Sequence, residues 1–183
     1  MDYERLSKLI SHALRHDPES YGLKLLNEGW VDTADLLKAI KRREPVFENI
    51  TFNDLNQLVH SSPKKRHEIK GERIRALYGH SVNVELGYQA NKPPKTLFHG
   101  ATNDSVCIIK QEGLKPMDRQ YVHLSVGKEE AKRVAERKSS NIVVLEIQAR
   151  KAHLAGVNFY LAENVWLCKA ILPEFISDYE RQN

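Results

Sequence analysis

The stretch that decides the fold is "RHEIKGERIRALYGHS", residues 66–81. It holds two short runs in which apolar and polar residues alternate, on either side of Lys70-Gly71-Glu72. Alternation with a period of two is typical of strands, and a central glycine favours a tight turn between them. The sequence therefore predicts a β-hairpin centred on Gly71.

An amphipathic helix is expected over residues 3–16, well ahead of the hairpin. Its apolar residues recur at helical spacing, and Pro18 ends the helix because it disfavours helical backbone in the residue before it. The apolar residues of this helix are Leu6, Leu9, Ile10, Ala13 and Leu14. At about 100° per residue, Arg15 falls opposite the apolar stripe and His16 falls on its flank. Cations at a helix C-terminus complement the helix dipole, so helix capping alone could explain both residues.

Two more helices are predicted between the first helix and the hairpin. "WVDTADLLKAIKRR", residues 30–43, has Asp32 as its N-cap. "ITFNDLNQLVHSS", residues 50–62, has Thr51 as its N-cap and Asp54 three positions on, as in a capping box. Three helices followed by a hairpin is the order of a winged-helix module.

After the linker candidate "ELGYQANKPPK", residues 85–95, strands alternate with helices. Strands are predicted in "TLFHG" (96–100), "YVHLS" (121–125), "NIVVLEIQA" (141–149) and "NVWLCKAIL" (164–172). One helix is expected in "DSVCIIKQEGL" (104–114), capped by Asp104 and closed by Gly113, and another over 127–138 with Ala131, Val134 and Ala135 facing inward. We expect an α+β protein with an N-terminal lobe over residues 1–88 and a mixed lobe over 89–183.

Composition excludes several classes of protein. The chain has 183 residues, 41% hydrophobic and 28% charged, with a net charge of +4 and no concentrated basic tail. No apolar run approaches the roughly 18–20 residues of a membrane span, and the N-terminus has no signal-peptide pattern, so we expect a cytoplasmic protein. No feature indicates an obligate dimer, so we expect a monomer. Cys107 and Cys168 lack the close spacing of a zinc site and are expected to be core thiols. His12 and His16 share a helical face, but a third ligand is missing, so no metal is expected.

The candidates for chemistry are histidines and arginines near strand ends. In "LFHGAT", residues 97–102, His99 precedes a glycine and a threonine, which suits a ribose or a phosphate held close to backbone. The glycine could equally serve only a turn at the end of a strand. His123 on "YVHLS" is followed by a hydroxyl in the same way. Arg66 and Arg119 lie next to element ends, from which a guanidinium can reach a cleft and hold phosphate by two hydrogen bonds.

Taken together, these blocks resemble the NAD-dependent RNA 2′-phosphotransferases, the KptA proteins and their fungal tRNA-splicing relatives. The resemblance covers almost the whole chain and rests on several blocks in order. They are "LSKLISHALRHDPE", "GWVDTADLL", "KKRHEIKGERIRALYGHS", "LFHGAT", "MDRQYVHLS" and "FYLAENVWL". It implies a winged-helix RNA-binding lobe followed by an ADP-ribosyltransferase-like NAD-binding lobe.

The resemblance also implies a reaction in two steps. An internal RNA 2′-phosphate attacks C1″ of the nicotinamide ribose of NAD⁺, nicotinamide leaves, and a 2′-phospho-ADP-ribosylated RNA remains. The ribose O2″ then attacks the phosphate, which releases 2′-OH RNA and ADP-ribose 1″,2″-cyclic phosphate. Because the phosphate nucleophile is ionised at neutral pH, the first step needs positioned cations rather than a general base.

The resemblance assigns the family's functional residues to the matching positions of this sequence. The family's catalytic tetrad falls on Arg15, His16, Arg66 and Arg119, where His16 assists the second step by proton transfer or by charge stabilisation. The residues expected to bind NAD⁺, which is consumed as a co-substrate, or to face the cleft are His99, Gly100, Thr102, His123, Ser125, Val165, Arg75, Gly79, His80 and Ser81. The register at Val165 is uncertain by one residue, and His67 stands where an aromatic is common.

Two other functions compete with this interpretation. A non-catalytic winged-helix nucleic-acid-binding protein would want a basic recognition helix, and "FNDLNQLVHSS" has no lysine or arginine. An ADP-ribosyltransferase acting on a protein or on another phosphate would use a glutamate on a late strand, and Glu163 lies two residues before Val165.

Overall fold

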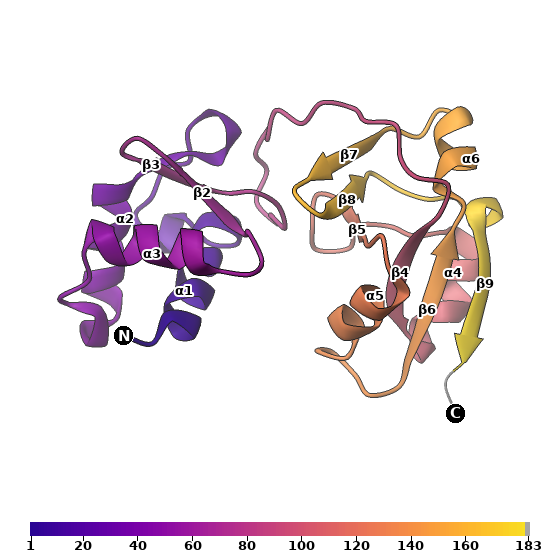
Figure 1. The fold of residues 1–183 in the computed structure, drawn as a ribbon, viewed down its shortest axis with the longest axis horizontal. Coiled ribbons are helices and arrows are strands. Elements are labelled where there is room, and N and C mark those ends of the chain that lie inside the picture. Colours follow the sequence, from indigo (N-terminus) through magenta and orange to yellow (C-terminus); the bar gives the residue numbers. More distant parts are fainter. Residues whose placement is uncertain (182–183) are drawn as a thin grey trace. The chain divides into compact units, whose positions relative to one another are not determined.

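The structure, a computed structural model, describes residues 1–181, and the chain forms two compact units (Figure 1). The first is Met1–Gly87 and the second begins at Tyr88. The first unit holds the helices α1 (Tyr3–Arg15), α2 (Thr33–Arg43) and α3 (Phe52–Ser61), and a sheet of β1 (Val31–Asp32), β2 (His67–Lys70) and β3 (Arg73–Ala76).

The predicted first helix is confirmed as α1. Its core face is Leu6, Ile10, Ala13 and Leu14, all with no exposed surface. The Asp2 side chain accepts a hydrogen bond from the Arg5 backbone N–H at 2.9 Å and so satisfies one of the unpaired donors at the helix start.

The hairpin is also confirmed, with a two-residue turn at Gly71 and Glu72 between β2 and β3. The sheet has the order β1-β3-β2, and both pairings are antiparallel. Because side chains alternate between the two faces of a strand, one face of the hairpin is buried and the other is not. Its core-facing residues include His67, Ile74 and Ala76.

Of the two predicted helix caps, one is confirmed in full. Thr51 and Asp54 form a reciprocal capping box at the start of α3. Asp32 occupies the N-cap position of α2, but its side chain makes no capping hydrogen bond. It lies instead 3.5 Å from the Arg73 guanidinium, the residue opposite it in the β1–β3 pairing.

The second unit contains two three-stranded antiparallel sheets. One has the order β4-β6-β9, from β4 (Leu97–Thr102), β6 (Ile142–Ile147) and β9 (Ile176–Arg181). The other has the order β5-β8-β7, from β5 (Val122–Leu124), β8 (Val165–Cys168) and β7 (Phe159–Ala162). A bridge between Phe98 and Ser125, with both N···O distances at 2.8 Å, joins β4 to the end of β5.

Three helices accompany these sheets: α4 (Val106–Glu112), α5 (Lys128–Ala135) and α6 (Ala149–Leu154). Helix α5 packs on β4 at Gly100, where a Cβ would lie 2.3 Å from the Ala131 carbonyl oxygen. Any side chain at Gly100 would push the helix away, so this glycine serves close packing. Ala131 and Ala135 face the sheet as predicted, whereas Val134 is 41% exposed and the prediction for it is wrong.

Two further details differ from the sequence predictions. Asp104 lies in a short 3₁₀ turn, and α4 begins only after Ser105. Gly113 does close α4, with φ +80°. Cys107 is exposed, so only Cys168 is a core thiol, and burial raises the pKa of Cys168 to about 12.

The fold is therefore α+β with small antiparallel sheets, as expected. The elements that the sequence did not predict are β1, β7, β9 and α6. None of the helices within residues 1–181 is both long and apolar enough to cross a membrane.

Candidate functional site

Arg15 lies at the C-terminal end of α1 and is held against the hairpin. Its Nη2 donates a hydrogen bond to the Arg66 carbonyl oxygen at 3.1 Å, and its guanidinium lies 5.3 Å from the centre of the Tyr78 ring. A Cβ at Gly79, which has φ +88°, would lie 3.5 Å from Arg15 Nη1. Arg15 is therefore half-buried, although the helical wheel places it opposite the apolar stripe. The structure therefore places the Arg66 backbone and Gly79 beside Arg15.

His16 follows Arg15, and its exposed ring is bound by Ser81. The distance from His16 Nδ1 to Ser81 Oγ is 3.0 Å. The backbone N–H groups of Ser81 and Val82 donate to the Arg15 carbonyl oxygen at 2.9 and 3.3 Å. These bonds satisfy a carbonyl that the end of α1 would otherwise leave unpaired and place Ser81 beside the imidazole. Ser81 thus fixes the orientation of His16.

Two histidines of the same region are buried in the first unit. His67 Nε2 lies 3.1 Å from Ser11 Oγ, and burial holds its pKa well below the usual value, with the charges of Arg15 and Arg66 acting in the same direction. His80 is 1% exposed, and its ring nitrogens have no hydrogen-bond partner among the described residues. Burial, followed by the charges of Arg15 and His16, lowers the pKa of His80 to about 4. Both imidazoles are therefore neutral at pH 7.

This burial predicts that the chain loses stability in mild acid. An unfolded histidine titrates near 6.5, so between about pH 6.5 and 4 the unfolded chain takes up a proton at His80 that the folded chain does not. The stability is complete above about pH 6.5 and falls toward pH 4. We expect His80→Leu to reduce the loss of unfolding free energy between pH 7.5 and 4.5 by roughly 2–3 kcal/mol, measured by urea denaturation. Exposed His60→Leu should leave that loss unchanged, and equal losses in the wild type and His80→Leu would contradict the prediction.

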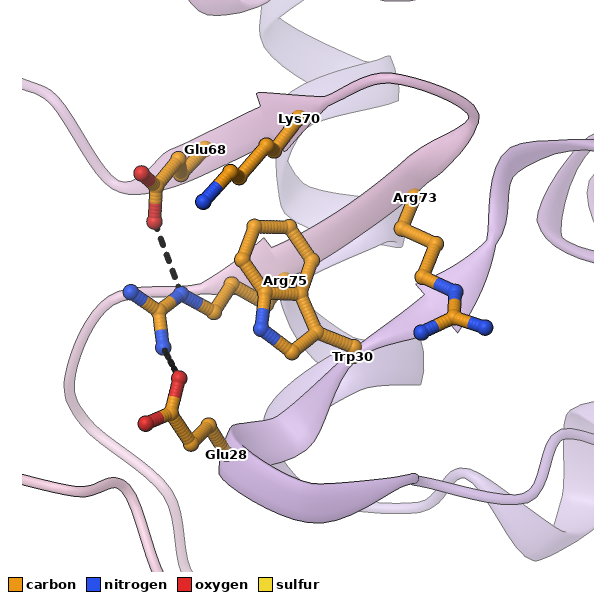
Figure 2. Close-up of a pocket in the computed structure, with 6 residues that line it drawn as sticks. All are labelled: Glu28, Trp30, Glu68, Lys70, Arg73 and Arg75. Atoms are coloured by element: carbon orange, nitrogen blue, oxygen red, sulfur yellow. Dashed lines mark hydrogen bonds and ion pairs between the residues drawn. The ribbon is translucent and has the colours of Figure 1, made fainter.

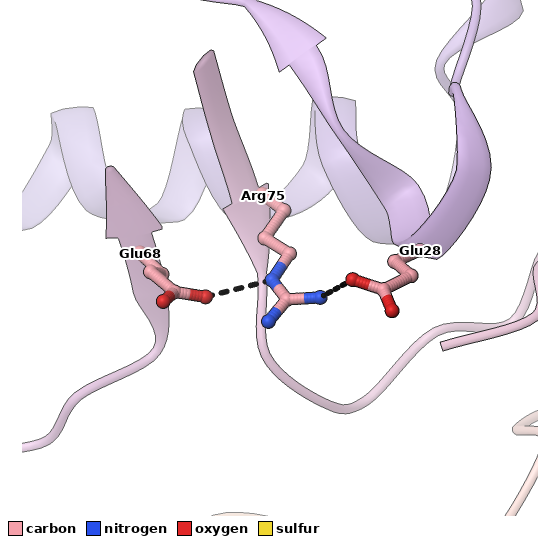
Figure 3. A network of polar contacts seen from close by, with 3 residues as sticks. All are labelled: Glu28, Glu68 and Arg75. Atoms are coloured by element: carbon pink, nitrogen blue, oxygen red, sulfur yellow. Dashed lines mark hydrogen bonds and ion pairs between the residues drawn. The ribbon is translucent and has the colours of Figure 1, made fainter. Parts of the chain in front are cut away.

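Arg75, another expected site residue, is fully engaged on the outward face of the sheet. Its guanidinium stacks 4.5 Å from the Trp30 ring centre, within a groove on that face (Figure 2). Its Nε donates to Glu68 and its Nη1 donates to Glu28, each at 2.8 Å (Figure 3). Two carboxylates thus neutralise this cation.

His99 and His123 lie at the junction of the two sheets of the second unit. His99 Nδ1 is 2.9 Å from the His123 carbonyl oxygen, and His123 Nδ1 is 2.9 Å from the Tyr121 carbonyl oxygen. A carbonyl only accepts, so each Nδ1 carries a proton, and in a neutral ring the lone pair is then on Nε2. Burial lowers the pKa of His99, the hydrogen bond to His123 opposes that, and the charges of Lys138 and Arg119 lower it further.

The remaining residues expected at the second unit's site have these places. Thr102 and Ser105 are linked in a turn before α4, with Thr102 Oγ1 donating to Ser105 Oγ at 3.2 Å. Ser125 makes the backbone bridge to β4 beside His99. Val165 is the first residue of β8 and pairs with Ala162 of β7.

Arg119 and Glu163 have contrasting positions. Arg119 is exposed in a turn closed by its backbone N–H on the Pro116 carbonyl oxygen at 3.1 Å, and its charge acts on His99. Glu163 is exposed in the two-residue turn between β7 and β8, with φ 55°. It therefore lies off the strand on which a catalytic glutamate would be expected.

The structure adds residues that the sequence did not single out. In the first unit they are Trp30, Glu28 and Glu68 around Arg75. In the second unit three tyrosine rings meet at centroid distances of 5.7, 5.7 and 6.0 Å: Tyr88, Tyr121 and Tyr160. Strand register could have indicated the first group, since Glu68 lies opposite Arg75. Within residues 1–181, no three histidine, cysteine or carboxylate side chains gather as a metal site would require.

Comparison with known proteins adds an independent finding. The model of a family described as RNA 2′-phosphotransferase, Tpt1 / KptA, matches residues 2–170. A probable RNA 2′-phosphotransferase of Acetivibrio thermocellus is 42% identical over 96% of this chain and 97% of its own length. One from Bacillus thuringiensis is 42% identical over 96% and 95%, and one from Thermococcus kodakarensis is 38% identical over 95% and 96%.

Proposed function

This chain belongs to the RNA 2′-phosphotransferase family Tpt1 / KptA, and we propose that it removes an internal 2′-phosphate from RNA by transferring it to NAD⁺. In this proposal the first unit is a winged-helix RNA-binding lobe and the second is an ADP-ribosyltransferase-like lobe that binds NAD⁺. The order of three helices and a hairpin supports the first assignment. The two small sheets joined at Phe98 and Ser125 support the second.

The observation that carries the proposal is the cluster at the end of α1. A guanidinium fixed by the Arg66 backbone lies next in sequence to an imidazole fixed by Ser81. Positioned cations suit a phosphate dianion, because they hold its oxygens and need no proton transfer to make it nucleophilic. Two hydrogen-bonded anchors keep these groups oriented before the substrate binds, which is what electrostatic catalysis requires.

The proposed reaction uses these groups in two steps. In the first, an RNA 2′-phosphate oxygen forms a bond to C1″ of the nicotinamide ribose and the bond to nicotinamide breaks, while Arg15, Arg66 and Arg119 position the phosphate. In the second, O2″ forms a bond to phosphorus and the bond to the RNA 2′-oxygen breaks, which yields 2′-OH RNA and a cyclic phosphate. The proton lost by O2″ is gained by the departing RNA 2′-oxygen, and His16 assists by moving this proton or by stabilising charge on the phosphate.

The second unit has side chains that fit NAD⁺. His99 and His123 both hold Nδ1–H on backbone carbonyls, so their Nε2 atoms can accept hydrogen bonds from ribose hydroxyls. In the proposal Gly100, Thr102, Ser125 and Val165 complete the lining. NAD⁺ would supply the electrophilic ribose carbon, and Val165 would leave that carbon without a competing carboxylate.

The competing functions lack comparable support. Helix α3 carries no lysine or arginine, so it does not favour insertion in a DNA groove. A protein ADP-ribosyltransferase would use Glu163, which lies in an exposed turn.

Ser81 provides a test of how His16 is positioned. We expect Ser81→Ala to slow the overall reaction about 3- to 10-fold, the value of one hydrogen bond, because the imidazole loses its anchor. Ser81→Thr, which keeps the hydroxyl, should restore most of the rate. The measurement is the time course of product and ADP-ribosylated RNA, with thermal unfolding as a control for folding. An unchanged rate in Ser81→Ala would contradict the positioning role.

Nicotinamide release tests the proposed co-substrate. The purified protein is incubated with NAD⁺ and either a short RNA bearing one internal 2′-phosphate or the same RNA without it. We expect nicotinamide only with the phosphorylated RNA. Nicotinamide release that does not depend on the RNA 2′-phosphate would indicate another acceptor of ADP-ribose. Release that is accompanied by modification of protein would indicate the same.

A further inference from the structure

The outward face of the sheet β1-β3-β2 carries an ordered array of side chains that the proposed reaction does not use. Register places Glu68 opposite Arg75 and Lys70 opposite Arg73 across the hairpin, and Asp32 opposite Arg73 on the other side. The array therefore has two rows that cross the strands. One contains Arg75 and Glu68 with Trp30 beside them (Figure 2). The other contains Arg73 with Lys70 and Asp32 as its cross-strand neighbours.

The first row presents a fixed aromatic ring. Glu28 and Glu68 hold the Arg75 guanidinium from two sides at 2.8 Å, and the guanidinium stacks 4.5 Å from the Trp30 ring centre. Glu28 has φ 60°, a conformation that costs a non-glycine residue energy, so its neighbours must hold the carboxylate there. The charge of Arg75 is neutralised, and its guanidinium lies against the Trp30 ring.

The second row presents positive charge. Lys70 and Arg73 lie directly opposite each other, and like charges in that position destabilise a hairpin. Asp32, at 3.5 Å from Arg73 Nε, offsets part of this charge. Lys70 makes no ion pair with any residue that the structure describes, and the Arg73 side chain is 57% exposed. The Lys70 ammonium extends toward Glu68, and the Arg73 guanidinium lies on the other side of the Trp30 ring, so the two cations flank the indole (Figure 2).

The two rows line one groove of about 410 Å³, formed by Glu28, Trp30, Glu68, Lys70, Arg73 and Arg75 (Figure 2). We propose that this Trp30 groove binds one nucleotide of single-stranded RNA, with its base stacked on Trp30 and the phosphates on the two sides of that nucleotide bound by Lys70 and by Arg73. An aromatic surface beside cations is the usual means of binding single strands without reading their sequence.

This inference rests on the proposed function for its choice of RNA, since the groove would hold a nucleotide that flanks the 2′-phosphate. An acidic peptide could meet the same cations but would leave the exposed indole face without a stacking partner. A free mononucleotide has the same base and phosphate chemistry but contains a single nucleotide. Tighter binding of an oligonucleotide than of a mononucleotide therefore distinguishes an RNA ligand from a free mononucleotide.

Tryptophan fluorescence tests the groove directly. The chain has two tryptophans, Trp30 and the buried Trp166, so the difference between wild type and Trp30→Phe reports on Trp30 alone. The probe is an unmodified single-stranded oligoadenylate, titrated without NAD⁺. We expect saturable quenching that weakens with salt, with a slope of about −0.7 per phosphate contact. The proposal would be contradicted if polyglutamate or AMP quenched Trp30 fluorescence at concentrations as low as those at which the oligoadenylate does.

A charge-reversal pair tests the second row. Lys70→Glu/Arg73→Glu is expected to weaken oligoadenylate binding at least about 10-fold more than Lys38→Glu/Lys41→Glu, which makes the same charge change on exposed positions of α2. Trp30→Leu should weaken binding by about 5- to 150-fold, the range for one stacked base. All four substituted side chains in the paired variants are exposed, so these variants should fold. Equal effects of the two charge reversals would overturn the proposal.

The outcome separates this proposal from the proposed function. Quenching without any nicotinamide release would leave the groove and remove the transferase assignment. Nicotinamide release and phosphate transfer without Trp30 quenching would keep the transferase and show that RNA binds elsewhere.

Discussion

Arg119→Ala is expected to reduce phosphate transfer by about 1,000-fold or more while leaving the folded protein as stable as the wild type. An arginine that neutralises a transferring phosphoryl group contributes about this much to the rate. Arg119 is exposed and its backbone forms the turn, so truncating the side chain leaves the fold intact. Arg119→Lys should recover little, since a lysine lacks the planar fork that holds two phosphate oxygens. The measurement is single-turnover loss of the RNA 2′-phosphate at saturating NAD⁺.

Two matched variants make this result specific. Arg137→Ala removes an equally exposed arginine from the same unit and should leave the rate within about twofold. Glu163→Gln should also be nearly as active as the wild type, since a turn carboxylate has no part in the proposed reaction. Loss of activity in Glu163→Gln, with Arg119→Ala active, would favour a protein ADP-ribosyltransferase instead.

His16→Ala is expected to separate the two steps of the reaction. The first step needs no proton transfer, whereas the second moves a proton from O2″ or develops charge that an imidazole can stabilise. We expect the second step to slow by about 100- to 10,000-fold and the first by much less. ADP-ribosylated RNA should then accumulate, which gel electrophoresis with labelled NAD⁺ measures.

The control for His16 is its exposed neighbour on the same helix. His12→Ala removes an imidazole one turn earlier and should show no intermediate. If His16→Ala slows the overall reaction and no ADP-ribosylated RNA appears, then His16 acts in the first step and the assignment is wrong.

Much of the fold could be predicted because its signals are local. The alternation around Gly71, the apolar period of α1 and the pair Thr51 and Asp54 each lie within a few residues. The sequence failed where long-range packing decides. Val134 is exposed because α5 packs on β4 through Ala131, Ala135 and Gly100. Short elements such as α6 and β1 carry too few residues to show a period.

The same distinction between local signals and long-range contacts applies to the candidate site. Motifs identify Arg15 and His16, but only the folded chain shows that Arg66, 51 residues away, binds Arg15 through its carbonyl. The contact between His16 and Ser81 spans 65 residues. Arg75 has the same residue type as the proposed phosphate ligands, yet in the structure its guanidinium is bound by two carboxylates. Residue type alone does not reveal such partners.

The fate of the phosphate tests the central claim most directly. An RNA with one internal 2′-phosphate labelled with ³²P is incubated with the protein, with and without NAD⁺, and the labelled products are separated. We expect all released label to appear in ADP-ribose 1″,2″-cyclic phosphate and no label to be released without NAD⁺. Label released as inorganic phosphate, or released without NAD⁺, would show that the protein hydrolyses the phosphate and does not transfer it to NAD⁺.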